Sequence, residues 1–191
     1  MTSGPIARAG LLARSERYIL QHGLLDLTLT ALAEGIGSNR RMLLYHFGSL
    51  DDLVKEAVGA ILARRELTAE LRAILSAPGG DVVERLDAAW AHLAEPAREP
   101  WHRIYFAQLG RAVEDPAAHE SFLAQSLIGW PTLVAEALAA AGIRDPAAPG
   151  RAVSALWSGL QVAMLSGADR AHLAEAHHRA VVALLESCTP A

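Results

Sequence analysis

The sequence contains one cysteine, Cys188, in 191 residues. A single cysteine cannot form a disulfide within the chain, and no group of cysteines and histidines has zinc-site spacing. No run of apolar residues approaches the roughly 20 that a membrane-spanning helix needs. Arg8, Arg14 and Arg17 interrupt the apolar positions near the N-terminus, so a signal peptide is not expected. We therefore expect a soluble, cytoplasmic protein.

Strand signals are also nearly absent, because alternating β-branched and aromatic runs do not occur. Hydrophobic residues make up 52% of the chain, which argues against disorder. We predict an all-α fold of about nine helices, from the apolar periodicity and the glycine, proline and capping signals. The predicted helices cover approximately residues 6–22, 29–36, 40–47, 50–75, 81–95, 101–114, 115–141, 150–166 and 169–187.

Several helix ends carry recognisable signals. Thr28 and Asn39 are placed to cap the second and third helices, and Gly37 and Gly48 are placed to end them. Ser49 and Asp52 have the spacing of a capping box, which would open the long helix over 50–75. Pro131 is predicted to kink the helix over 115–141, because proline lacks a backbone N–H.

The net charge of −4 argues against a broad basic surface for nucleic acid. Residues 1–55 hold six basic and five acidic side chains, whereas residues 56–191 hold 11 basic and 16 acidic ones. Any contact with DNA must therefore come from a few well-placed residues in the N-terminal part.

The segment GSNRRMLLYHFGSLDDL, residues 37–53, has the composition of such a contact. A short helix, a glycine turn and a second helix form a helix-turn-helix, whose second helix enters the DNA major groove. Leu43 and Phe47, four residues apart, are predicted to face the core. The outer surface would then carry Arg40, Arg41, Tyr45 and His46, which can reach base edges or phosphates.

The stretch TLTALAEGIGSNRRMLLYHFGSLDDL closely resembles the DNA-binding domain of the TetR family of bacterial transcription regulators. The matching residues are Thr28, Leu32, Ala33, Gly37, His46, Phe47, Ser49 and Leu53, within a resemblance that covers about residues 8–60. The resemblance implies a DNA-binding domain over residues 1–50 and a ligand-binding and dimerisation domain over residues 51–191. It places near the duplex Thr28, Asn39, Arg40, Arg41, Met42, Leu44, Tyr45 and His46.

Two residues depart from the family pattern. Leu44 stands where the family usually has a tyrosine, and Tyr45 follows it. Leu50 replaces the usual lysine at the start of the fourth helix, which removes one charge from the phosphate contacts. We expect a weaker salt dependence of DNA binding than in relatives, because each phosphate contact contributes about −0.9 to the log–log slope.

Seven of the ten aromatic residues lie beyond residue 89. Each one alone is better explained as hydrophobic core, but together with several glutamines they could line an apolar pocket. The resemblance implies such a ligand cavity between the fifth and eighth helices. We expect it to involve Trp101, Tyr105, Gln108, Phe122, Trp130, Trp157 and Gln161.

Small residues on the last two predicted helices would permit close packing, either within the chain or between two copies. The resemblance implies a homodimer through these helices, and hence a palindromic operator with half-sites about 34 Å apart or a multiple of it. A small apolar or amphipathic effector would release the repressor by tilting the helix over 50–75.

Two alternatives stay open. An enzyme is disfavoured, because no Gly-x-Ser-x-Gly elbow, phosphate-binding loop or His-Glu-x-x-His motif occurs, and we expect no catalytic residues, cofactor or metal. His172 and His177 are five apart, which suits a solvated helix face better than a metal site. A TetR-like sensor or scaffold that has lost DNA binding is the second alternative, favoured by Leu50 and the weak positive charge.

Overall fold

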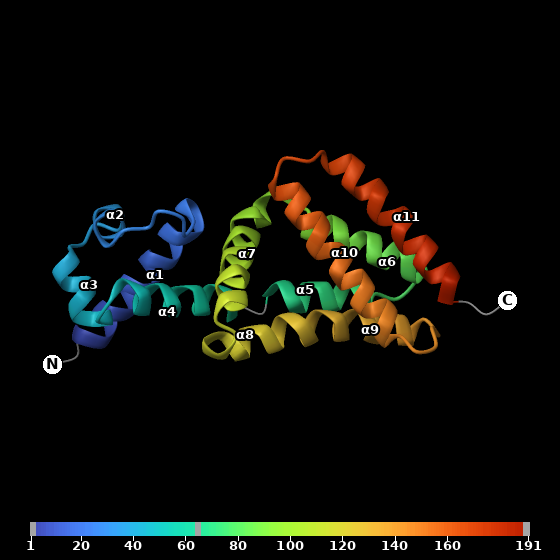
Figure 1. The fold of residues 1–191 in the computed structure, drawn as a ribbon, viewed down its shortest axis with the longest axis horizontal. Coiled ribbons are helices and arrows are strands. Elements are labelled where there is room, and N and C mark those ends of the chain that lie inside the picture. The colour runs from blue at the N-terminus through green and yellow to red at the C-terminus, as the bar shows by residue number, and fades with distance from the viewer. Residues whose placement is uncertain (1–2, 64–65, 189–191) are drawn as a thin grey trace. The chain divides into compact units, whose positions relative to one another are not determined.

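The computed structural model describes residues 3–63 and 66–188, and all regular elements in these residues are helices (Figure 1). This confirms the all-α prediction. No helix in the described ranges combines the length and apolar character needed to cross a membrane. The chain divides into two compact units: unit 1 comprises residues 1–65 and 100–111, and unit 2 comprises residues 66–99 and 112–191. These units reflect packing and leave the functional boundary expected at residue 50 a prediction.

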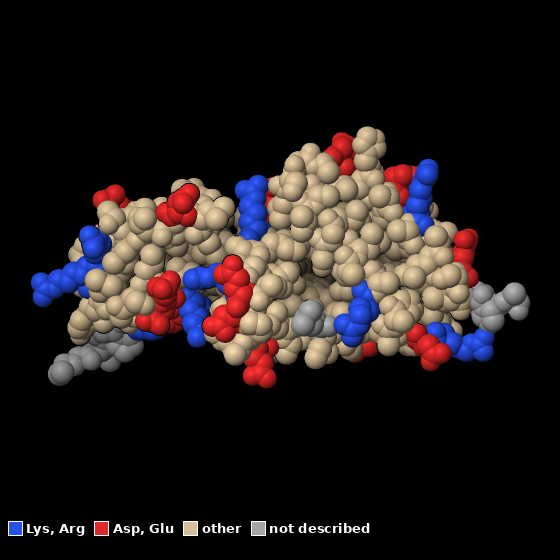
Figure 2. Space-filling model, viewed as in Figure 1, with Lys and Arg blue, Asp and Glu red and all other residues tan. Residues whose placement is uncertain are grey.

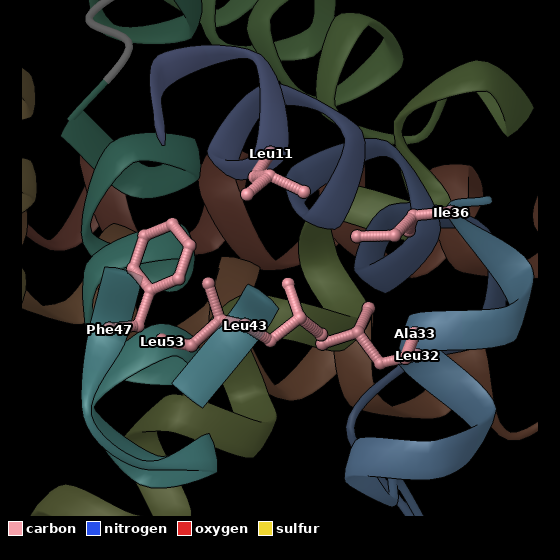
Figure 3. Close-up of a cluster of buried hydrophobic side chains, with 7 residues drawn as sticks. All are labelled: Leu11, Leu32, Ala33, Ile36, Leu43, Phe47 and Leu53. Carbon is pink, nitrogen blue, oxygen red and sulfur yellow. The ribbon is translucent and has the colours of Figure 1, made fainter. Parts of the chain in front are cut away.

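Unit 1 contains four helices and most of a fifth: α1 (Ser3–His22), α2 (Leu29–Gly35), α3 (Arg40–Phe47), α4 (Leu50–Ala63) and α7 (Glu99–Glu114). One buried cluster joins α1 to α4 through Leu11, Leu32, Ala33, Ile36, Leu43, Phe47 and Leu53 (Figure 3). A second joins α1, α4 and α7 through Ile19, Val54, Ala57, Val58, Ile61 and Ile104.

Unit 2 contains α5 (Glu66–Leu75), α6 (Val82–Leu93), α8 (Glu120–Ala124), α9 (Trp130–Ala140), α10 (Ala147–Leu165) and α11 (Arg170–Cys188). Short 3₁₀ turns lie at Pro96–Arg98 and Ala117–His119. Helix α10 contacts both α9 and α11, α11 also contacts α6, and α6 contacts α5 (Figure 1). Helix α10 therefore packs between α9 and α11 in this helical unit.

One predicted helix is divided in the structure, and another extends across residues that the structure does not describe. The predicted 50–75 helix corresponds to α4 and α5. Whether these two helices are continuous depends on residues 64 and 65, which lie outside the described residues. The predicted 115–141 helix comprises α8, a π-helical turn (Gln125–Gly129) and α9. Pro131 lies in the first turn of α9. Proline has no N–H to donate to a preceding carbonyl, which disturbs the regular helical hydrogen bonds. The π-helical turn lies directly before Pro131, where the kink was expected.

One side of α11 is buried in unit 2. Its buried residues are Leu173, His177, Val181 and Leu185. His177 itself is fully buried, with 0% exposure, so the prediction that it lies on a solvated face is wrong. Its burial is explained by hydrogen bonds that the linear sequence does not reveal.

Candidate nucleic-acid interface

Helices α2 and α3 form a helix-turn-helix with both predicted caps in place. The backbone N–H of Ala31 donates to the hydroxyl of Thr28 at 3.1 Å, and that of Met42 donates to Oδ1 of Asn39 at 2.9 Å. Gly37 lies in the turn with a φ of 64°, a left-handed conformation that favours glycine. The backbone N–H of Ser38 donates to the carbonyl of Ala33 at 2.8 Å and closes the turn.

Helix α3 has one buried face and one exposed face. Leu43 and Phe47 are 1% and 7% exposed, and both belong to the cluster in Figure 3. Arg40, Arg41 and Tyr45 are exposed, as predicted. His46, also expected on the outer surface, is half-buried instead. Its ring lies edge-on to that of Tyr45, with 5.0 Å between the ring centroids. The guanidinium groups and the phenol are therefore the most accessible polar groups of this helix.

The scaffold behind α3 depends on an arginine that the sequence analysis did not single out. Arg8, on α1, donates to both carboxylate oxygens of Glu56 at 2.7 and 2.6 Å. Its Nε donates to the backbone carbonyl of His46 at 3.2 Å, and its guanidinium lies 4.6 Å from the ring centre of Phe47. The hydrogen bond to Glu56 raises the pKa of Arg8. One side chain thus connects α1 with α3 and α4.

A second arginine supports the turn. Arg14, also on α1, donates to the carbonyl of Ile36 at 2.9 Å, next to Gly37. Arg8 and Arg14 thus have structural partners within unit 1, whereas Arg40 and Arg41 project from α3. Figure 2 shows Lys and Arg side chains projecting at the end of unit 1 where Figure 1 places α3.

The start of α4 explains one departure from the family pattern. Leu50 is half-buried and packs against both hydrophobic clusters of unit 1. Ser49 accepts a hydrogen bond from the Asp52 N–H at 3.0 Å, but its hydroxyl donates to the Asp52 carboxylate at 2.6 Å. The carboxylate therefore contacts the Ser49 side chain rather than its backbone N–H, and the predicted capping box forms only in part.

The residues predicted to bind a ligand are distributed over both units. Trp101, Tyr105 and Gln108 lie on α7 within unit 1, and the rings of Trp101 and Tyr105 stack at 5.4 Å with an 11° angle. Within unit 2, Phe122 lies on α8, Trp130 begins α9, and Trp157 and Gln161 are buried on α10. A common pocket for these seven residues stays a prediction.

Unit 1 contains a pocket of about 340 Å³ that none of these seven residues lines. This volume is near the lower end for small-molecule sites, about 300 Å³. Its walls come from the loop after α1, the first turns of α4 and the end of α7, and are formed by Leu24, Leu25, Leu27, Leu50, Asp51, Val54, Ala107 and Arg111. Asp51 and Arg111 approach to 3.7 Å at exposed positions, so their ion pair contributes little stability.

A buried polar cluster lies in unit 2. The indole N–H of Trp157 donates to Nε2 of His177 at 2.9 Å, so the proton of a neutral His177 is on Nδ1. That nitrogen lies 2.9 Å from Oδ1 of Asp87, and Nδ1 of His178 lies 2.7 Å from Oδ2. Burial lowers the pKa of His177 despite the hydrogen bond to Asp87, whereas that carboxylate raises the pKa of His178. The described residues contain no cluster of three or more potential metal ligands.

Comparison with known proteins adds to this geometry. No protein-family model and no curated protein matches the sequence. A solved structure from Rhodococcus sp., described as a TetR-family transcriptional regulator, superposes on this chain with a TM-score of 0.63. The two sequences are 22% identical, and the match covers 95% of this chain and 97% of the other. The chain has the TetR fold.

Two further structures superpose on nearly the whole chain. A transcriptional regulator from Rhodococcus sp. Rha1 has a TM-score of 0.71 and 21% identity, covering 96% of this chain and 98% of the other. The multidrug binding protein EbrR, complexed with imidazole, has a TM-score of 0.61 and 25% identity, covering 94% and 90%. The likeness therefore includes the helices beyond the helix-turn-helix.

Proposed function

We propose that this protein is a ligand-responsive transcriptional regulator of the TetR family, which binds a palindromic DNA operator through α3. The observation that carries this proposal is the exposed side of α3, where Arg40, Arg41 and Tyr45 project from a helix anchored by Leu43 and Phe47. Arginine binds guanine O6 and N7 bidentately in the major groove. The capped, glycine-turned geometry of α2 and α3 supports this role.

A small apolar or amphipathic effector releases the protein from its operator in this proposal. The packing of α7 supports it, because α7 carries Trp101 and Tyr105 and also places Ile104 in the core between α1 and α4. An effector that shifts α7 would disturb the helices that hold α3. It weakens DNA binding only by its preference for the shifted state. The ligand complex of EbrR, which has the same fold, is consistent with an effector.

Two copies would associate through α10 and α11. Both helices expose small residues at helical spacing, namely Ala152, Ala155, Gly159, Ala176, Ala180 and Ala183. Such residues let helices approach closely, and a two-fold axis would repeat α3 along one face of the duplex. We therefore infer a homodimer, with half-sites separated by about one DNA turn or a multiple of it.

Selection of bound sequences from a random DNA pool tests the DNA-binding part of the proposal. We expect enrichment of a palindrome, and a loss of affinity of about 10- to 100-fold in Arg41→Ala and in Arg40→Ala, the range for a lost base contact. Arg17→Ala, an exposed arginine of α1, is the matched control for charge. Unchanged affinity in both α3 variants, or an equal loss in the control, would show that α3 is not the recognition helix.

A sensor that retains the fold without binding DNA is the second candidate. It is favoured by Leu50, which packs into the core where the family usually presents a lysine to phosphate. Failure of the random pool to enrich any sequence, even at low ionic strength, would support this candidate over the first.

A further inference from the structure

The exposed side of α3 carries apolar side chains beside its arginines. Met42, Leu44 and Tyr45 are 38%, 41% and 80% exposed. These three are a large share of a helix of eight residues. Successive residues of a helix are rotated by roughly 100°, so the positions of Leu43 and Phe47 define the inward direction. Arg41 and Tyr45 then point away from the core, with Met42 and Leu44 on the two flanks.

An exposed leucine in a DNA-reading helix has a narrow choice of favourable contacts. Leu44 has no donor or acceptor for a phosphate or a base edge. Against a G·C pair it would cover polar edge atoms without offering them a hydrogen bond, which is unfavourable. Against thymine it can bury the C5 methyl group, the apolar feature of the major groove.

Leu44 also has a fixed relation to one arginine. It lies four residues after Arg40, so both side chains project on the same side of α3, about 6 Å apart along its axis. This distance is between one and two base-pair steps of about 3.4 Å. A guanine bound by Arg40 would therefore have the thymine contacted by Leu44 close beside it.

We propose that Leu44 determines operator specificity by contacting a thymine methyl group within one or two base pairs of the guanine read by Arg40. This inference rests on the proposed DNA-binding function. It assigns an attractive contact to thymine and a desolvation penalty to G·C at the same position, so one side chain discriminates in both directions. Met42, on the opposite flank of α3, would contact a different base pair of the operator.

Uracil scanning of the selected operator tests the inference. Each thymine is replaced singly by uracil, which removes only the methyl group, and the dissociation constant is measured by fluorescence anisotropy. We expect one position per half-site at which uracil weakens binding about fourfold, the change expected for one buried methyl group. In Leu44→Ala the affinities for the thymine and uracil operators become equal at that position.

Met42→Ala is the matched control, because it removes a neighbouring exposed apolar side chain and should keep the uracil effect at the Leu44 position. Unchanged thermal unfolding of both variants excludes a folding defect. Operator binding without any uracil-sensitive position, or a uracil effect that persists in Leu44→Ala, overturns this inference alone. Failure to bind any DNA overturns the proposed function as well.

Discussion

At the scale of single residues, the hydrogen-bond partners of His177 and His178 predict how stability depends on pH. Both imidazoles contact Asp87, but one is buried between Trp90 and Trp157 and the other is exposed. Burial lowers the pKa of His177, with the charge of His178 adding to this and Asp87 opposing it. Asp87 raises the pKa of His178, with smaller effects of Glu175 and Asp81. Protonation therefore has opposite consequences at these two neighbours.

We predict that His178→Gln makes the protein more sensitive to acid. Because the folded-state pKa of His177 is below its ordinary value near 6.5, the unfolded chain binds a proton first as the pH falls, and stability is lost. His178, with a raised pKa, contributes stability that is present below about 6.5 and is lost as the pH rises through its folded value. Removing His178 takes away this opposing contribution, while its charge is the smallest of the influences on the pKa of His177.

Urea unfolding at about pH 7.5 and about pH 5.5 measures this effect as a change in unfolding free energy. The loss between the two pH values should be larger in His178→Gln than in the wild type. His172→Gln, at an exposed position of the same helix, should behave like the wild type. An equal or smaller loss in His178→Gln would contradict the assigned roles.

Trp157 supplies a second prediction for this cluster. Trp157→Phe keeps an aromatic ring but removes the N–H that donates to Nε2 of His177. A buried acceptor then lacks its donor, which costs about 1–3 kcal/mol. We expect a decrease of this size in the unfolding free energy, measured by urea denaturation at neutral pH. Wild-type stability would show that this hydrogen bond contributes nothing.

At the scale of helices, local signals in the sequence were sufficient for α2 and α3. Thr28 and Asn39 cap them, and Gly37 adopts its positive φ, because each of these preferences acts within a few residues. The division of the 115–141 segment was less predictable. Proline indicates a disturbed hydrogen bond, but whether the chain bends or widens into a π-helical turn depends on packing against neighbouring helices.

The crossing of α9 and α10 depends on one glycine. A Cβ atom on Gly150 would lie 2.9 Å from the Cβ of Ala135 and 2.9 Å from the carbonyl oxygen of Pro131. A backbone oxygen cannot move without separating the two helices. We therefore expect Gly150→Ala to lower the unfolding free energy by about 1–3 kcal/mol, measured by urea denaturation.

Gly59, an exposed glycine within α4, is the control for this substitution. A Cβ added there would have no neighbouring atom within 4 Å. Because alanine favours helices over glycine, Gly59→Ala should stabilise the protein by up to about 1 kcal/mol. If both substitutions changed stability in the same direction, close approach at Gly150 would not be the cause.

At the scale of the whole molecule, the proposed function requires two copies of the chain. We predict a homodimer by light scattering, and a monomer for Gly159→Arg, because a long charged side chain would replace the smallest residue of the exposed α10 face. Operator affinity should decrease when dimerisation is lost, since a monomer contacts only one half-site. Ala88→Arg adds the same charge at an exposed position of α6 and should remain dimeric. A strictly monomeric wild type would contradict the proposed interface.

The sequence by itself determined the helical class, the helix-turn-helix and the inward positions of Leu43 and Phe47, because apolar periodicity and caps act over a few residues. Only the tertiary structure revealed the contacts of Arg8 with Glu56 and Phe47, which join residues far apart in the chain. It likewise decided that Ile104 of α7 packs with α1 and α4. Such contacts depend on how separate helices pack together, and local preferences do not encode that packing.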